Sequence, residues 1–251
     1  MFSDLFHDDG VSSSSTEEDE QEEEEPIDYT AFNTKCVAQK RTLKVKAFGD
    51  VDYWDKQYSS TSNYEWYTKE SYAPMCSTLL QLVSQPFRKQ SKILTIGCGN
   101  SFFARHLIDI GFYHVQATDY SIEAIKFQLE KQSHLAGEMY SSIAYHCLNA
   151  RDMMNVEASV FDIIIDRATL DAIDCEGVDG SVNEDVTVEV AAEVMRVLKQ
   201  GGVFLILTCR RPSRRLETFV NIDKELYDIL ESKKLDMGDG QDIFLVAIRK
   251  K

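Results

Sequence analysis

The feature that most constrains the fold is a short glycine-containing turn between two apolar segments. Residues 97–101, Gly-Cys-Gly-Asn-Ser, directly follow the apolar run 93–96, and Asp119 ends the next apolar run, 115–118. This spacing is typical of a parallel α/β sheet in which the glycine turn lets the backbone approach a ligand and the acid accepts ribose hydroxyls. The pattern therefore predicts a strand, turn, helix and second strand that together bind an adenosine.

The residue after the turn narrows the choice of ligand. Dinucleotide-binding turns carry a third glycine at the position that Phe102 occupies here, because helix and strand pack closely beside a pyrophosphate. A bulky aromatic residue argues against a pyrophosphate and favours an adenosine cofactor with a short amino-acid tail, as in S-adenosylmethionine (AdoMet). An ordinary strand–turn–helix junction is the alternative for the turn taken by itself.

Strand and helix patterns alternate along the chain from residue 93 onward. Strands buried on both faces are predicted by near-continuous apolar runs at 93–96, 115–118, 143–148, 161–166 and 203–208. Segments 226–235 and 243–248 are separated by a loop too short for a helical crossover, so we expect them to pair antiparallel. The sequence thus predicts a Rossmann-like α/β fold with a seven-stranded sheet, mostly parallel, that ends in an antiparallel C-terminal hairpin.

Local signals also predict helix boundaries. Apolar residues at helical spacing indicate a helix over 72–89 that Pro86 closes. Ser121 is expected to cap the helix that follows the second strand, and Gly201 and Gly202 to end a helix over 186–198.

Acidic residues are concentrated at the N-terminus. The net charge is −15, yet residues 1–28 hold twelve acids and no lysine or arginine, which leaves 30 acids against 27 bases elsewhere. A segment so poor in apolar residues cannot bury enough surface to fold by itself. We therefore expect a disordered acidic tail over 1–41 and one domain over 42–251. The tail either solubilises the protein or attracts a basic partner.

Several classes of protein are disfavoured by composition. No apolar run approaches the roughly 20 residues that span a bilayer, and the N-terminus lacks a signal-peptide pattern, so we expect a cytoplasmic protein without membrane contact. The six cysteines include no C-x-x-C pair, and the histidines do not cluster, so no metal site is expected. Basic residues gather in one short patch, at Arg210, Arg211, Arg214 and Arg215. A nucleic acid is not expected as the main substrate, and the chain is expected to be a monomer.

Several short motifs in combination resemble one enzyme family. They are Tyr-Trp-Asp-Lys-Gln-Tyr at 53–58, Glu-Trp-Tyr at 65–67, Leu-Thr-Ile-Gly-Cys-Gly-Asn-Ser at 94–101, Thr-Asp-Tyr-Ser at 118–121 and Phe-Asp-Ile-Ile-Ile-Asp-Arg-Ala-Thr-Leu-Asp-Ala at 161–172. Together they resemble the class I AdoMet-dependent methyltransferases. Within that class they are similar to the lysine methyltransferases of translation elongation factor 1A, namely the branch of the endothelin-converting-enzyme-2 locus product and the N-terminal domain of the dual elongation-factor methyltransferase. The likeness covers about residues 50–210.

The resemblance implies AdoMet as cofactor and assigns residues to it. Trp54, Tyr58 and Trp66 would close over the methionine side and the sulfonium, a fixed cation that aromatic faces attract. Asp119 would accept the ribose hydroxyls. The other residues implied in cofactor binding are Gly97, Gly99, Tyr120, Asn149, Ala150 and Arg167.

Two residues depart from the pattern of this family. Arg167 stands where lysine is usual, and the two side chains are not interchangeable. Ala168 stands where glycine is usual, which makes a positive φ at this position less expected. Both departures lie beside the expected acceptor pocket, so they bear on the substrate more than on the chemistry.

The acceptor in this family is a lysine amine, which must lose its proton before it attacks, because its free pKa is about 10.4. Asp166 is the first candidate for holding the amine and Asp171 the second, with helix capping or backbone bonding as the alternative for each. The implied function is AdoMet-dependent protein-lysine N-methylation, with elongation factor 1A as the expected protein substrate. A methyltransferase for a small molecule and a non-catalytic AdoMet-binding scaffold are the alternatives.

Overall fold

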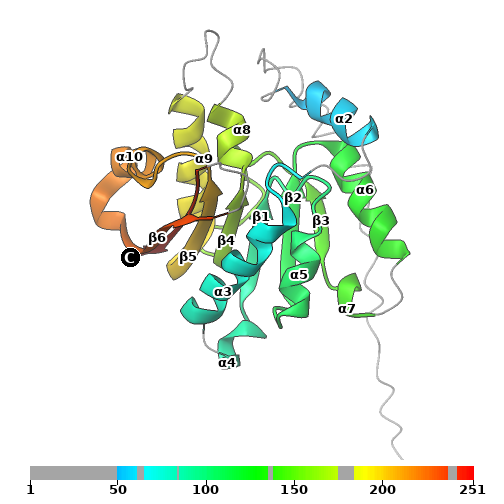
Figure 1. Cartoon of the computed structure of the whole chain (residues 1–251), viewed down its shortest axis with the longest axis horizontal. Helices are drawn as coiled ribbons and strands as arrows, with labels where there is room; N and C mark the ends of the chain where they lie inside the picture. Colours follow the sequence, from blue (N-terminus) through cyan, green and yellow to red (C-terminus); the bar gives the residue numbers. More distant parts are fainter. Residues whose placement is uncertain (1–49, 61–64, 84, 135–137, 175–183, 237–241) are drawn as a thin grey trace, which may run out of the picture.

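A seven-stranded sheet runs through the molecule in the order β3-β2-β1-β4-β5-β7-β6 (Figure 1). Its strands are β1 (Lys92–Ile96), β2 (His114–Asp119), β3 (Ala144–Cys147), β4 (Phe161–Arg167), β5 (Leu198–Thr208), β6 (Tyr227–Leu235) and β7 (Ile243–Lys250). Strands β1 to β5 pair parallel, whereas β7 pairs antiparallel with both β5 and β6. The predicted fold class, a mostly parallel sheet with an antiparallel C-terminal pair, is confirmed.

The computed structural model describes residues 50–60, 65–83, 85–134, 138–174, 184–236 and 242–251. The expected tail over 1–41 and the first eight residues of the expected domain, 42–49, lie outside these ranges. None of the helices within them is both long and apolar enough to cross a membrane.

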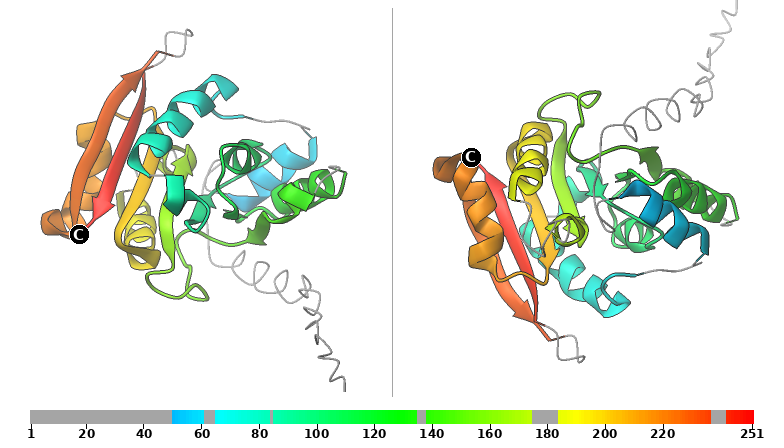
Figure 2. Two further views of the ribbon diagram at one scale, coloured as in Figure 1. Left: turned by 90° about the horizontal axis from the view of Figure 1, so that it is seen from below. Right: turned by 90° about the horizontal axis from the view of Figure 1, so that it is seen from above.

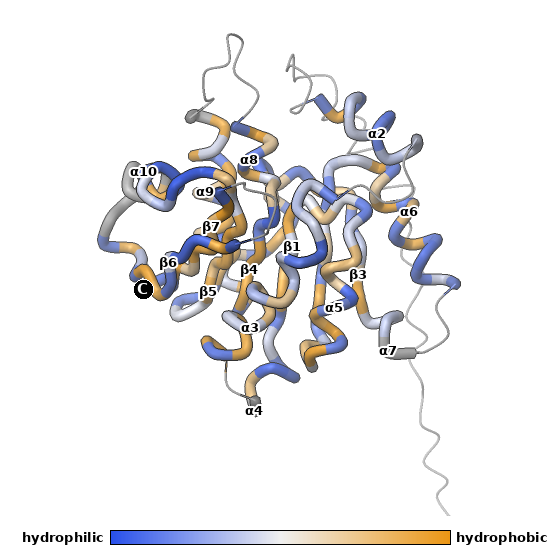
Figure 3. Tube along the Cα trace, in the orientation of Figure 1, coloured by the Kyte–Doolittle hydropathy of each residue, from blue (hydrophilic) through white to orange (hydrophobic). Residues whose placement is uncertain are grey.

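Helices cover both faces of the sheet (Figure 2), and the central strands β1 and β4 are accordingly buried along most of their length, whereas the edge strand β6 is largely exposed and hydrophilic (Figure 3). Ile93 packs into the core under α3 and α5, and its neighbour Leu94 packs into the core under α9 and α10. The longer helices are α2 (Val51–Ser60), α3 (Tyr72–Leu82), α5 (Phe103–Asp109), α6 (Ile122–Ser133), α8 (Thr169–Asp174), α9 (Glu184–Val197) and α10 (Pro212–Asp223). The shorter ones are α4 (Gln85–Arg88), α7 (Glu138–Ser141) and the 3₁₀ turns Lys69–Ser71 and Lys224–Leu226.

Two predicted helix boundaries are wrong and one local signal is confirmed. The single helix predicted over 72–89 is two helices: α3 ends at Leu82, because a proline ring inside a helix collides with the carbonyl four residues earlier, and α4 begins at Gln85. Gly201 and Gly202 do not end α9; they lie within β5, where the register against β4 shifts and Gly201 has a φ of +76°. Ser121 caps α6 as predicted, since its side chain accepts a bond from the N–H of Ala124 at 3.3 Å.

Candidate functional site

One pocket opens at the carboxyl ends of the parallel strands, the edge at which such sheets bind their ligands. The register sets Ile96 beside both Thr118 and Asp166, so the residues that follow β1, β2 and β4 lie side by side. The pocket contains about 870 Å³ of space, including the solvent at its mouth. It brings together all ten residues predicted for cofactor binding: Trp54, Tyr58, Trp66, Gly97, Gly99, Asp119, Tyr120, Asn149, Ala150 and Arg167. Eight further lining residues were not predicted: Cys98, Ser101, Leu148, Arg151, Ala168, Thr169, Ala172 and Ile173.

The glycine turn fits tightly between α8 and α2. Gly97 and Gly99 both have positive φ, at +57° and +52°. A Cβ atom on Gly97 would lie 2.0 Å from Oγ1 of Thr169, and one on Gly99 would lie 2.7 Å from the hydroxyl of Tyr58. Packing and backbone conformation therefore each require glycine at both positions.

Asp119 is buried at the floor of the pocket and is held by the backbone. One carboxylate oxygen accepts the N–H of Gly99 at 2.8 Å, and the other accepts the N–H of Ser121 at 2.9 Å. Burial raises the pKa of Asp119 to about 6, while these two N–H groups act in the opposite direction. Because an ionised carboxylate can accept about four hydrogen bonds, the fixed side chain keeps capacity for a ligand that donates hydroxyl groups.

Three aromatic side chains form one wall of the pocket. Trp54 and Tyr58, both on α2, stack with ring centroids 5.5 Å apart, and Trp54 lies 6.0 Å from Trp66. Helix α2 lies against α6 (Figure 1), and Ser121 donates its hydroxyl to Asp55 of α2 at 2.6 Å. Ser121 therefore connects α2, which carries Trp54 and Tyr58, to the end of β2, the strand that carries Asp119.

The segment after β3 also lines the pocket, with Leu148, Asn149, Ala150 and Arg151. The N–H of Leu148 donates to the carbonyl of Asp119 at 2.8 Å, which pins this segment to β2. The side chain of Asn149 accepts the N–H of Arg151 at 3.0 Å, and Arg151 pairs with Glu189 at 2.7 Å.

Arg167 lines the pocket, but its donors are directed to the segment 65–72 and to Ser101 of the glycine turn. It pairs with Glu65 at 2.7 Å, donates to Ser71 at 3.2 Å and to Ser101 at 3.3 Å, and also donates to the carbonyl of Tyr67. The predicted contact of Arg167 with a cofactor stays a prediction. In the structure, Arg167 anchors the segment that carries Trp66.

Ala168 overturns one expectation. An alanine in place of the usual glycine made a positive φ less expected at this position. The φ of Ala168 is nevertheless +77°, which is the left-handed conformation. The N–H of Ala168 donates to the carbonyl of Leu207 at 3.3 Å, and helix α8 begins at the next residue, Thr169, whose N–H donates to the side chain of Asp166 at 2.9 Å. These flanking bonds hold the chain in a conformation that costs an alanine about 1–2 kcal/mol.

Asp166, the first candidate for holding an amine, caps helix α8. One oxygen accepts the N–H groups of Thr169 at 2.9 Å and Leu170 at 3.3 Å, whereas the other has no hydrogen-bond partner among the described residues. Burial and the nearby Asp171 raise the pKa of Asp166 to about 7. The side chain is completely buried and is not part of the pocket lining, so a catalytic role for Asp166 stays a prediction.

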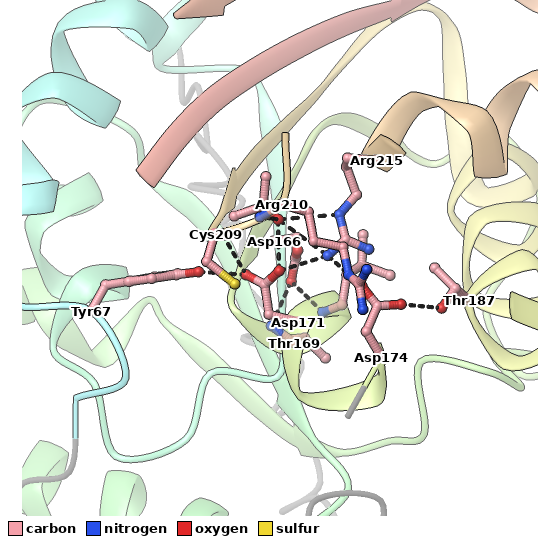
Figure 4. Close-up of polar contacts among 11 residues, drawn as sticks. Tyr67, Asp166, Thr169, Asp171, Asp174, Thr187, Cys209, Arg210 and Arg215 are labelled. Carbon is pink, nitrogen blue, oxygen red and sulfur yellow. Dashed lines mark hydrogen bonds and ion pairs between the residues drawn. The ribbon is translucent and has the colours of Figure 1, made fainter. Parts of the chain in front are cut away.

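Asp171, the second candidate, belongs to a buried ionic network (Figure 4). It pairs with Arg215 at 2.7 Å, and Arg215 also pairs with Asp174 at 2.8 Å. The expectation of a basic surface patch is therefore wrong for Arg215, which is only 1% exposed, and Arg210 too is engaged by Asp174. The network lies behind the pocket, between α8, α10 and the end of β5.

Different signals mark the lining residues that were not predicted. Ser101, Thr169 and Ala172 stand within the motifs at 94–101 and 161–172, so the motifs already contained them. Arg151 directly follows Ala150, which was assigned to the cofactor, and Ile173 directly follows the motif at 161–172, but neither residue carries a signal of its own. Among the described residues, no group of three histidine, cysteine, aspartate or glutamate side chains is arranged to hold a metal ion.

Comparisons with known proteins agree with this geometry. The chain is 30% identical over 165 residues to the eEF1A lysine and N-terminal methyltransferase of Bos taurus, an alignment that covers 65% of this chain and 22% of that protein. The chain thus spans about a fifth of that relative. It is 28% identical over 222 residues to the EEF1A lysine methyltransferase 2 of Homo sapiens, covering 81% of this chain and 87% of that protein.

Solved structures and a family model extend the comparison. The N-methyltransferase NodS from Bradyrhizobium japonicum has the same fold, with a TM-score of 0.55 at 16% identity over 78% of this chain and 98% of that one. The family model described as a methyltransferase domain matches residues 87–243, from α4 to the start of β7. This match spans most of the sheet and its helices, and the chain therefore belongs to the methyltransferase domain family.

Proposed function

We propose that this chain is an AdoMet-dependent protein-lysine N-methyltransferase that acts on translation elongation factor 1A. The observation that carries the proposal is the composition of one pocket. A buried carboxylate, a glycine turn with positive φ and a wall of aromatic rings line the same cavity.

The residues of the pocket fit the chemistry of AdoMet. Asp119 supplies acceptor oxygens for the ribose hydroxyls, and Tyr120, Asn149 and Ala150 lie where an adenine would follow. The faces of Trp54 and Trp66 would attract the sulfonium by about 0.5–2 kcal/mol each when desolvated. When bound, AdoMet supplies an electrophilic methyl group, which passes in line to a nucleophile.

The protein contributes position and desolvation to this transfer. A neutral amine held in line with the methyl group gains most of its rate from orientation and from the exclusion of water. The apolar side chains of Ala172 and Ile173 line the pocket together with Thr169 and would help to exclude water from a bound cofactor. Asp166 and Asp171 stay candidates for holding the amine, although in the structure protein donors occupy Asp171 and one oxygen of Asp166.

The target is inferred from relatives. Both relatives described above are named as methyltransferases of eEF1A, and one of them aligns over 87% of its length. A methyltransferase acting on a small molecule and a non-catalytic AdoMet-binding scaffold are the alternatives. We also propose a cytoplasmic, monomeric protein, which fractionation and sedimentation would test.

Radiolabelled AdoMet tests the proposal directly. Elongation factor 1A purified from cells that lack this gene should accept label from the wild-type chain and not from Asp119→Ala, and mass spectrometry should place the methyl group on a lysine. Label found only in small molecules would favour the first alternative. AdoMet binding without any S-adenosylhomocysteine formed in lysate would favour the scaffold.

A further inference from the structure

Trp66 lies between two neighbours whose side chains are both anchored in the protein. On one side, the carboxylate of Glu65 pairs with Arg167 at 2.7 Å and accepts the hydroxyl of Tyr72 at 2.6 Å. On the other side, Tyr67 is buried at 2% exposure and donates its hydroxyl to Asp171 at 2.5 Å. The indole between these anchors lines the pocket and lies against Trp54.

Asp171 is itself held by donors from two other elements (Figure 4). Its Oδ1 accepts the hydroxyl of Thr208 at 2.6 Å and Nη2 of Arg215 at 2.7 Å. Its Oδ2 accepts the N–H of Cys209 at 3.2 Å in addition to the hydroxyl of Tyr67. Because a carboxylate offers about four acceptor positions, these four donors fill Asp171, and an incoming amine would have to displace one of them.

We propose that Tyr67, Asp171 and Arg215 form a positioning device that fixes Trp66 against the cofactor pocket. This inference rests on the proposed function, because it assigns Trp66 to the wall around the sulfonium. Asp171 acts through Tyr67, and Arg215 acts through Asp171, so all three are positioning residues and none of them touches the substrate. Asp171, the second candidate for holding the amine, is thereby assigned to the support of the aromatic wall.

The chemistry of the contact suits a fixed support. Burial and the Asp171 carboxylate raise the pKa of Tyr67 well above its ordinary value, so the phenol keeps the proton that it donates. The acceptor is a carboxylate paired with a guanidinium that is 1% exposed, and charge-assisted bonds of this kind are short and directional. A side chain held in this way has little freedom, and its neighbour Trp66 is held with it.

The two tryptophans of the chain make the device measurable. Both Trp54 and Trp66 line the pocket, and the chain contains no other tryptophan. In a Trp54→Phe background, fluorescence therefore reports on Trp66 alone. Acrylamide quenching is measured in this background without AdoMet, before and after Tyr67→Phe. Tyr227→Phe is the matched control, because it also removes the hydroxyl of a buried tyrosine, but on β6 at the far edge of the sheet.

We expect Tyr67→Phe to increase the quenching of Trp66, and Tyr227→Phe to leave it unchanged. In the chain with both tryptophans, Tyr67→Phe should lower kcat about tenfold, because a misplaced wall costs orientation in the transition state. The KM for AdoMet should change by a smaller factor than kcat, since the hydrogen bonds between the ribose and Asp119 are unaffected. Asp171→Asn is the second variant and should increase the quenching as well.

Unchanged quenching in Tyr67→Phe and in Asp171→Asn would overturn the inference. If the variants lose thermal stability but the quenching of Trp66 is unaltered, the three residues stabilise only the core, and the inference is overturned as well. The quenching measurement uses no cofactor, so its result is independent of the proposed function. If AdoMet fails to change the tryptophan fluorescence of the wild-type chain, the proposed function fails instead.

Discussion

Asp166→Asn separates two roles for the carboxylate at the end of β4. The wild-type side chain caps α8 through one oxygen, which accepts the N–H groups of Thr169 at 2.9 Å and Leu170 at 3.3 Å. Asparagine keeps an oxygen for these two bonds, removes the negative charge and puts an amide NH2 group in place of the other carboxylate oxygen. The variant therefore tests the charge of Asp166 without removing the cap.

The expected effect on stability depends on pH. The pKa of Asp166 rises from 3.8 to about 7 in the folded protein, through burial and the proximity of Asp171. The folded state thus holds this proton more tightly than the unfolded state, and the contribution of Asp166 to stability falls as pH rises from about 4 to about 7. The full loss is roughly 4 kcal/mol, of which about 3 kcal/mol fall between pH 5 and pH 8. Asparagine does not titrate, so the stability of the variant relative to wild type should increase by about 3 kcal/mol over this interval.

Urea denaturation of both proteins at pH 5, 6, 7 and 8 measures this difference. The new amide N–H group is buried without an acceptor and costs about 1–3 kcal/mol, but this cost is independent of pH and shifts only the offset. Groups common to both proteins cancel in the comparison. A difference that stays constant from pH 5 to pH 8 would refute the reasoning, because it would mean that folding does not raise the pKa of Asp166.

The same variant decides whether Asp166 holds the amine. Removal of a group that assists proton transfer costs about 10²–10⁴ in rate. If Asp166 only caps α8, the hydrogen bonds of the cap survive in Asp166→Asn and the substitution should change the rate little. A kcat within about threefold of wild type would therefore assign Asp166 a structural role in the site.

Four further results are expected. Asp119→Ala should weaken AdoMet binding at least about tenfold in calorimetry, because the ribose loses charge-assisted bonds. For the wild type, the same measurement should show affinity falling as pH drops below about 6, where Asp119 takes up a proton. Ala168→Gly should raise the free energy of unfolding by about 1 kcal/mol in thermal denaturation, since glycine adopts the φ of +77° without strain; a less stable variant would contradict this. Deletion of residues 1–28 should leave the circular dichroism spectrum and AdoMet binding unchanged, and a loss of either would give the tail a structural role.

The order of elements in the fold could be predicted because its signals are local. Strands buried on both faces need continuous apolar runs, and each run predicted in this way corresponds to a strand. The two wrong helix boundaries lie where the end of the helix depends on contacts that the local sequence pattern does not show. Pro86 limits the helix at Leu82, four residues earlier in the chain. Gly201 lies where the register of β5 against β4 shifts, and not at the end of a helix.

The pocket could be predicted from motifs because its lining follows the ends of successive strands. Gly97 follows β1, Asp119 ends β2 and Arg167 ends β4, so neighbours in the sheet become neighbours in the cavity. Ala168 shows the limit of this reasoning. An alanine in place of glycine predicts an ordinary φ, but bonds on both sides of it hold the backbone at +77°.

The ionic network behind the pocket is harder to predict, because its members are far apart in the sequence. A buried arginine is costly unless the fold brings a carboxylate to it, and the sequence does not show that Asp171 will lie 2.7 Å from Arg215. A local signal nevertheless exists. Arg215 stands four residues before Phe219, which places the two side chains on the same face of α10, and Phe219 is buried in the core. Arg214 points elsewhere and pairs with Glu217 at the surface. A basic run that begins a helix should therefore be divided by helical face before it is counted as a surface patch, and the arginine on the apolar face indicates a buried acid on another element.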